Sequence, residues 1–133
     1  MKSLFCMFCT LAIASSVSAQ ETGNAMLKYG LNFLKTPYVA HTLEVNEEEK
    51  LVVNFDEVDC TTFVEYVLAL SLSPVKNGAI DKTDYARVLQ KIRYRDGRIN
   101  GYTSRLHYIA DWINNGVKHG FMEDVTAANS PDS

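Results

Sequence analysis

Hydrophobic residues recur at the spacing of an α-helix in four stretches of the chain, residues 24–35, 59–70, 81–92 and 103–115. In each stretch they are three or four positions apart, which places them on one helix face and predicts that this face is buried. The residues expected on the buried faces are Leu27, Leu31 and Leu34; Phe63, Val64, Val67 and Leu68; Tyr85, Val88, Leu89 and Ile92; and Leu106, Ile109, Ala110 and Ile113. The pattern therefore predicts a structure built mainly of amphipathic helices.

Helix-capping residues stand at the start of each stretch. The candidate N-caps are Asn24, Asp59, Asp81 or Thr83, and Thr103 or Ser104. Their side chains can accept hydrogen bonds from the backbone N–H groups that the first turn leaves free. Gly116 follows the last stretch and is expected to end that helix.

Strand signals are sparse. Residues 51–55, LVVNF, are one candidate strand. Residues 92–102, IRYRDGRINGY, are a candidate hairpin about Asp96-Gly97, because Asp-Gly favours the turn that fits the twist of paired strands. Few strands are therefore expected to pack against the helices.

The first residues, MKSLFCMFCTLAIASSVSAQ, predict a signal peptide over residues 1–19. Lys2 precedes an apolar run that is too short to span a bilayer, and small residues ending at Ala19 fit a cleavage site. We expect export to the periplasm or the extracellular space, with no membrane anchor after cleavage. Cleavage leaves Cys60 as the sole cysteine, so no disulfide can form within one mature chain.

Charge and composition exclude several classes of function. The formal net charge of −3, without a basic stripe, argues against nucleic acid or anionic lipid as the main partner. The cysteine and histidines lack the spacing of a zinc site, and neither a glycine-rich phosphate loop nor a G-x-S-x-G elbow is found. No cofactor or metal is expected. Residues 20–133 suffice for one small domain, and the sequence does not fix its oligomeric state.

Cys60 is the main candidate for chemistry. It follows Asp59 at the predicted start of the helix DCTTFVEYVLAL. The helix dipole and the free N–H groups favour an anion there, and the thiolate is the nucleophilic form of cysteine. The alternative is that Cys60 is a small buried hydrophobe, the common fate of a free cysteine.

Three segments carry a resemblance to a known family. KTPYVAHTLE, LVVNFDEVDCTTFVEYVLAL and IRYRDGRINGYTSRLHYIADWI together resemble the N-acetylmuramoyl-L-alanine amidase-like branch of the NlpC-type, papain-like cell-wall cysteine hydrolases. The resemblance extends from about Leu27 to Thr126. It implies an α+β, papain-like fold of which this chain holds the helix-rich N-terminal half, with an incomplete sheet.

The function implied by this resemblance is that of an exported bacterial cysteine amidase. It would act on peptidoglycan or muropeptides and cleave the amide between N-acetylmuramic acid and L-alanine. A D-glutamyl endopeptidase of the same superfamily is one alternative. A non-catalytic muropeptide-binding remnant that lacks a general base is another.

Site residues are implied by the same resemblance. Cys60 matches the nucleophile, and Tyr38 matches an active-site tyrosine, with a packed aromatic as its alternative role. Asp59 occupies the motif position beside the substrate and is expected mainly to cap the helix. The segment YTSRLHY resembles a helical segment near the site, so Ser104 and Arg105 become candidate substrate-binding residues. For Arg105, a surface or interhelical ion pair is the alternative.

A cysteine nucleophile needs a general base, normally a histidine oriented by a third polar group. In the resembled superfamily this histidine lies on a strand downstream of the cysteine, and this sequence contains no such segment. His107 is the remaining candidate base, with Asp111 four residues on to orient its ring. The alternative is a half-exposed helical histidine paired with an acid. His41 is expected to line the cleft, and His119 to lie in a solvated loop.

Two accounts of the missing base follow from the sequence. The amidase-like domain over residues 20–133 is truncated at its C-terminus and lacks the sheet that carries the base, or the chain is complete and His107 replaces it. The scarcity of strands favours truncation.

Overall fold

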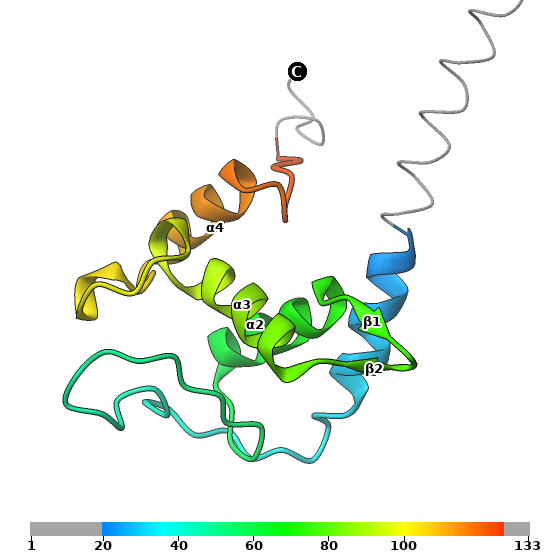
Figure 1. Ribbon diagram of the computed structural model, residues 1–133, viewed down its shortest axis with the longest axis horizontal. Coiled ribbons are helices and arrows are strands. Elements are labelled where there is room, and N and C mark those ends of the chain that lie inside the picture. Colours follow the sequence, from blue (N-terminus) through cyan, green and yellow to red (C-terminus); the bar gives the residue numbers. More distant parts are fainter. Residues whose placement is uncertain (1–19, 127–133) are drawn as a thin grey trace, which may run out of the picture.

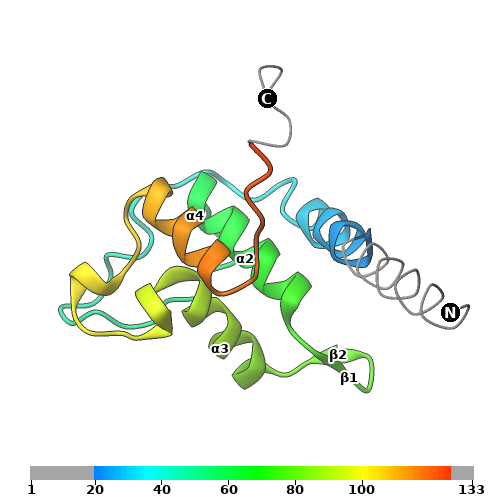
Figure 2. The same cartoon turned by 90° about the horizontal axis from the view of Figure 1, so that it is seen from above.

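Helix α2, Cys60–Leu72, lies at the centre of the molecule in a computed structural model that describes residues 20–126 (Figure 1). The predicted signal peptide, residues 1–19, lies outside the described residues. The elements in chain order are a first helix over residues 20–31, α2, the strands β1 (Val75–Lys76) and β2 (Ala79–Ile80), α3 (Lys82–Arg93), the 3-10 turns η1 (Arg95–Gly97) and η2 (Tyr102–Ser104), and α4 (Ile109–Lys118). The first helix and α4 lie on opposite sides of α2 (Figure 1, Figure 2).

The predicted starts of α2 and α3 are confirmed. Asp59 caps α2 through a reciprocal pair of bonds with Thr62, and its carboxylate accepts from the Thr62 backbone N–H at 2.7 Å. Asp81, rather than Thr83, caps α3 by accepting from the backbone N–H groups of residues 83 and 84. Both helices begin where an acidic side chain satisfies free N–H groups of the first turn.

The core lies mainly between α2 and α3. Tyr66 of α2 and Leu89 of α3 are fully buried, and a buried ion pair joins Arg93 Nε to Glu65 Oε2 at 2.7 Å. Burial raises the pKa of the Glu65 carboxyl, and the adjacent Arg93 guanidinium opposes this shift. The Arg93 guanidinium also donates to the Val52 carbonyl, so the pair fixes both α3 and the segment before the cysteine onto α2.

The sheet is a short hairpin that the pattern analysis missed. Val75 pairs with Ile80, and Lys76 with Ala79, on either side of an Asn77-Gly78 turn. Both turn residues have positive φ, 52° and 77°, as expected for the hairpin turn that Asn-Gly favours. The Asn-Gly pair in VKNGAI was the available signal.

Both predicted strand regions are wrong. Residues 51–55 form no strand, because helix side chains bind their backbone: the Asn54 N–H donates to the Tyr66 hydroxyl at 3.0 Å. Asp96 and Gly97 do form a turn with positive φ, but it follows α3 directly as η1. The sole strand-like contact beside this turn, among the described residues, is an isolated bridge between Tyr94 and Arg105.

The fourth helix begins later in the chain than the sequence predicted. Instead of beginning near Ser104, α4 begins at Ile109 and continues through Gly116, which is buried within it. The Leu106 N–H donates to the Arg93 carbonyl at 2.9 Å, and this tertiary bond holds the preceding segment extended. Asn24 likewise lies inside the first helix and does not cap it.

Two predicted core faces are exposed. Leu27, Leu31 and Leu34, at the first helix and the turn after it, are largely solvent-accessible, as are Ile109 and Ile113 of α4. The amphipathic pattern correctly indicated helices there, but neighbouring elements do not cover these faces within residues 20–126. No helix in that range has the length and apolarity needed to cross a membrane.

Candidate active site

Cys60 is exposed at the first turn of α2. The alternative prediction, that Cys60 is a small buried hydrophobe, is therefore wrong. The nearest polar contact of its sulfur is the Thr61 hydroxyl at 4.0 Å. The Asp59 carboxylate accepts from both the N–H and the hydroxyl of Thr62, at 2.7 and 3.0 Å, so its capping role is confirmed. Cys60 thus combines an accessible thiol with a helix N-terminus.

Tyr38 is held beside the segment that leads into the cysteine. It pairs with Val58 in a parallel bridge, in which the Val39 N–H donates to Val58 and the Val58 N–H donates to Pro37. The Tyr38 side chain is 71% exposed, so the packed-aromatic alternative is wrong. A role in substrate binding stays a prediction.

A pocket of about 310 Å³, which we call the cysteine-side pocket, adjoins the start of α2. Three segments that are distant in sequence line it: residues 40–44, the start of α2, and residues 102–107. Three buried polar atoms of its lining residues, Thr42 Oγ1, Arg93 Nη2 and Arg105 Nε, have no hydrogen-bond partner among the described residues, although Arg105 Nε is ion-paired with Glu49. Buried polar groups are rarely left unsatisfied, so this wall is suited to water or a polar ligand.

Both histidines near this pocket have partners other than the thiol. His107 Nε2 lies 2.9 Å from the Tyr102 carbonyl oxygen, and its ring lies against the Tyr102 ring with centroids 4.2 Å apart. His41 lies in the left-handed region at φ 63°, with Nδ1 3.6 Å from Glu44. His41 is among the residues that line the cysteine-side pocket.

The predicted pair of His107 with Asp111 is not formed. Because α4 begins only at Ile109, the two residues are not one helical turn apart, and Asp111 instead pairs with Arg95 at 3.3 Å. His107 as the base stays a prediction. His119 lies at the end of α4, 3.0 Å from Asp96, and hydrogen bonds from Lys118 and His119 lower the pKa of that carboxyl.

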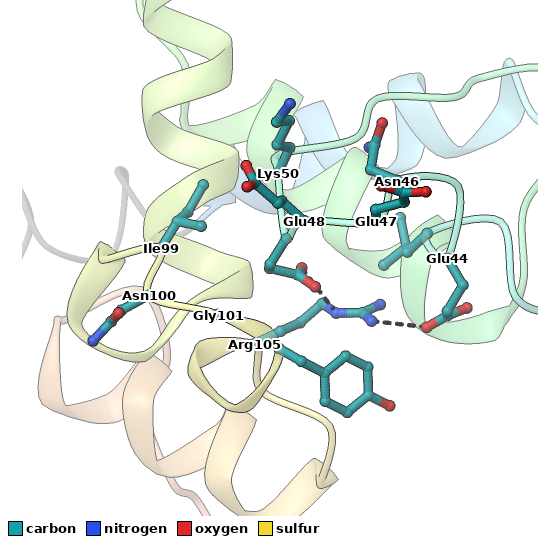
Figure 3. A pocket seen from close by; sticks show the side chains of 12 residues that line it. Glu44, Asn46, Glu47, Glu48, Lys50, Ile99, Asn100, Gly101 and Arg105 are labelled. Atoms are coloured by element: carbon teal, nitrogen blue, oxygen red, sulfur yellow. Dashed lines mark hydrogen bonds and ion pairs between the residues drawn. The ribbon is translucent and has the colours of Figure 1, made fainter.

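Arg105 is buried and already neutralised. Its guanidinium pairs with Glu44 at 2.8 Å (Figure 3). It also pairs with Glu49 at 3.2 Å and lies over the Tyr102 ring. The hydrogen bond from Arg105 lowers the pKa of the Glu44 carboxyl. Arg105 therefore forms ion pairs, but they are neither at the surface nor between helices: they join the buried guanidinium to the acidic segment 44–50, which they anchor. Substrate binding by Arg105 stays a prediction.

Ser104 has a local role in the turn before Arg105. Its hydroxyl accepts from the Asn100 N–H at 2.9 Å and donates to the Gly101 carbonyl at 2.7 Å. It is not among the lining residues of the cysteine-side pocket. Its predicted contact with substrate is untested.

Two further pockets adjoin the cysteine-side pocket. The acidic pocket, about 480 Å³, is lined by residues 43–44, 46–50, 99–102 and 105 (Figure 3). The tyrosine pocket, about 380 Å³, is lined by Arg95, Tyr102, Thr103, Arg105, His107, Tyr108 and Asp111. Tyr102 and Arg105 line all three, so the pockets share walls around these two residues.

Sequence reasoning missed Glu44, Tyr102 and Tyr108 as lining residues. The two tyrosines are the first and last residues of the quoted segment YTSRLHY, so the signal was present. Glu44 gave no local signal, because its partner Arg105 is 61 residues away.

Comparison with known proteins identifies a family for this chain. The family described as N-acetylmuramoyl-L-alanine amidase-like matches residues 28–133. A crystal structure of an N-acetylmuramoyl-L-alanine amidase from Bacteroides uniformis ATCC 8492 is 65% identical, with a TM-score of 0.77 over 80% of this chain and 46% of that chain. No curated protein matches.

Two further solved structures are similar. A Bacteroides fragilis protein provisionally described as a xylanase is 63% identical, with a TM-score of 0.74 over 79% of this chain and 45% of its own. A Legionella pneumophila protein is only 22% identical, with a TM-score of 0.68 over 86% of this chain and 38% of its own, and so indicates a shared fold alone. The chain spans less than half of the length of each of these three structures.

Proposed function

Because the chain belongs to the N-acetylmuramoyl-L-alanine amidase-like family, we propose that it supplies the nucleophile of a cysteine amidase acting on peptidoglycan or muropeptides. The bond cleaved is the amide between the lactyl group of N-acetylmuramic acid and L-alanine. The observation that carries the proposal is the exposed thiol of Cys60 at the N-terminus of α2, beside the cysteine-side pocket.

The proposed reaction uses the position of Cys60. Its thiolate adds to the amide carbonyl carbon, and backbone N–H groups at the helix start stabilise the oxyanion. The C–N bond then breaks, the nitrogen takes a proton and leaves as the amine of L-alanine, and a thioester remains. Water cleaves this thioester, which releases the lactyl carboxylate and restores the thiol.

Fold and export form part of the same proposal. We place the chain in an α+β, papain-like (NlpC-type) enzyme, supported by the exposed cysteine at a helix start and by the segments quoted above. Export is supported by the signal-like sequence of residues 1–19.

One observation favours a second candidate, a non-catalytic muropeptide-binding role for this chain alone. Within residues 20–126 no histidine is hydrogen-bonded to the Cys60 sulfur, and His107 Nε2 lies 2.9 Å from the Tyr102 carbonyl oxygen. Without a general base, binding would persist while turnover would be lost.

Thiol alkylation tests the nucleophile directly. A protein beginning at Gln20 has Cys60 as its one cysteine, so iodoacetamide labelling reports this site alone. We expect labelling at neutral pH to be faster than that of free cysteine and to slow when muropeptide is added. Labelling at the rate of free cysteine, unaffected by muropeptide, would contradict the proposal.

Product analysis separates the remaining candidates. Incubation with purified muropeptide, with Cys60→Ser as the control, is followed by mass spectrometry. A free lactyl carboxylate indicates the amidase, and cleavage after D-glutamate indicates the endopeptidase. Protection of the thiol without any product indicates the binding role.

A further inference from the structure

The tyrosine pocket has an aromatic rim that the reaction itself does not use. Tyr108 is 76% exposed and stands immediately before α4. No hydrogen bond, ion pair or ring contact holds its side chain within residues 20–126, whereas Tyr102 is fixed by His107 and Arg105. The pocket therefore has one fixed aromatic wall and one free aromatic face.

Polar groups in the same pocket complement the rings. Thr103 contributes a hydroxyl, and the Arg95–Asp111 pair contributes a planar donor and a planar acceptor. This pair is partly exposed, at 55% and 43%, so hydroxyl groups of a ligand can compete for its hydrogen bonds. An aromatic face with a few directional polar groups is the usual composition of a small-ligand site.

The tyrosine pocket lies next to the proposed reaction centre. It shares Tyr102, Arg105 and His107 with the cysteine-side pocket. Asp59 and Thr61, which flank Cys60 in the chain, line the cysteine-side pocket, so a ligand that crosses the shared wall would have one part at the start of α2 and the other against Tyr108. The scissile amide of a muropeptide joins two such parts, a sugar and a peptide.

We infer that the tyrosine pocket binds the saccharide part of the substrate, with a sugar ring stacked on Tyr108. The inference rests on the proposed function. The face of a pyranose ring that carries axial C–H groups is apolar and packs against an aromatic ring, while its hydroxyl groups pair with Thr103, Arg95 and Asp111. The acidic pocket is less suited, because four glutamates line it and Tyr102 is its one aromatic residue.

Binding without turnover provides the test. The Cys60→Ala protein is titrated separately with the disaccharide of N-acetylglucosamine and N-acetylmuramic acid and with the free stem peptide, and binding is followed by NMR chemical shifts. Tyr108→Ala should weaken disaccharide binding by about five- to tenfold, the range expected for one aromatic contact. Tyr108→Phe should retain it, and stem-peptide binding should stay unchanged in both variants.

Tyr29→Ala is the matched control, because this tyrosine of the first helix does not line the three pockets. The inference is overturned if the disaccharide gives no saturable shifts, if Tyr108→Ala leaves its affinity unchanged, or if the variant weakens the stem peptide instead. Disaccharide binding that depends on Tyr108, in a protein that releases no lactyl carboxylate, would support the saccharide site while contradicting the amidase. Conversely, if the protein that retains Cys60 hydrolyses the muropeptide with a KM that Tyr108→Ala leaves unchanged, the amidase is supported and the saccharide site is contradicted.

Discussion

Asp59 directs its carboxylate toward the backbone of Thr62, although it immediately precedes Cys60, the proposed nucleophile. We predict that Asp59→Ala lowers the free energy of unfolding by about 1 kcal/mol, because the first turn of α2 loses its cap. Asp59→Asn, which can still accept the same bond, should keep most of this stability. Urea denaturation measures both variants, and an equal loss in the two would show that the charge, rather than the cap, is what matters.

Glu44 gives the stability of the protein a dependence on pH. Its pKa lies below the ordinary value of 4.5 because Arg105 donates a hydrogen bond to it. The stabilisation is complete above the ordinary pKa and is lost as the pH falls through the lower folded value, because the unfolded chain binds the proton first. Glu44→Gln should therefore lower thermal stability near neutral pH and weaken its decline at acidic pH.

Thermal unfolding followed by circular dichroism between about pH 7 and pH 3 checks this prediction. Glu47→Gln is the matched control, because it removes a carboxylate of the same segment that has no ion pair among residues 20–126. Parallel pH curves for wild type and Glu44→Gln would contradict the role given to the Arg105 pair.

At the scale of elements, the hairpin β1–β2 depends on a left-handed glycine. Gly78 has φ 77°, and a Cβ there would meet no atom within 4 Å, so backbone strain is the sole cost of alanine. Gly78→Ala should lower stability by about 1–2 kcal/mol. Gly23→Ala, in the first helix and also in open space, should raise stability by about 0.5–1 kcal/mol. Urea denaturation measures both, and a neutral Gly78→Ala would contradict the strain.

The sequence predicted the starts of α2 and α3, because a capping residue next to each start determines it. Asp59 and Asp81 identified α2 and α3, because a cap acts on N–H groups two or three residues away. The start of α4 could not be predicted this way, because Arg105 and Leu106 are held extended by partners far away in the sequence. The candidate site shows the same difference. Cys60 and Tyr38 could be predicted from sequence motifs, whereas the three pockets with shared walls could not, because they depend on the long-range ion pair of Arg105 with Glu44.

At the scale of the whole molecule, the exposed apolar faces have a measurable consequence. Ile109 and Ile113 lie one turn apart on α4 and are 58% and 39% exposed. Contiguous exposed apolar surface promotes association, so we expect the protein over residues 20–133 to self-associate as its concentration rises. Ile109→Ser with Ile113→Ser should reduce this association.

Sedimentation velocity over a concentration series checks the expected association. Val75→Ser serves as the control, because Val75 is similarly exposed but lies on β1. The proposed association through α4 would be contradicted if the wild-type protein stays monomeric at all concentrations. It would also be contradicted if Val75→Ser reduces association as much as the double variant of α4 does.

The exposure of the Cys60 thiol also makes this residue accessible to oxidants. A thiolate open to solvent is the form that peroxide converts to sulfenic acid and that exchanges with disulfides. Residues 20–133 contain no second cysteine, so a sulfenic acid at Cys60 has no resolving thiol in that range and is reduced by an external thiol or oxidised further. In the oxidising compartment that the proposed export implies, we therefore expect oxidation of this one sulfur atom to limit how long the protein stays active.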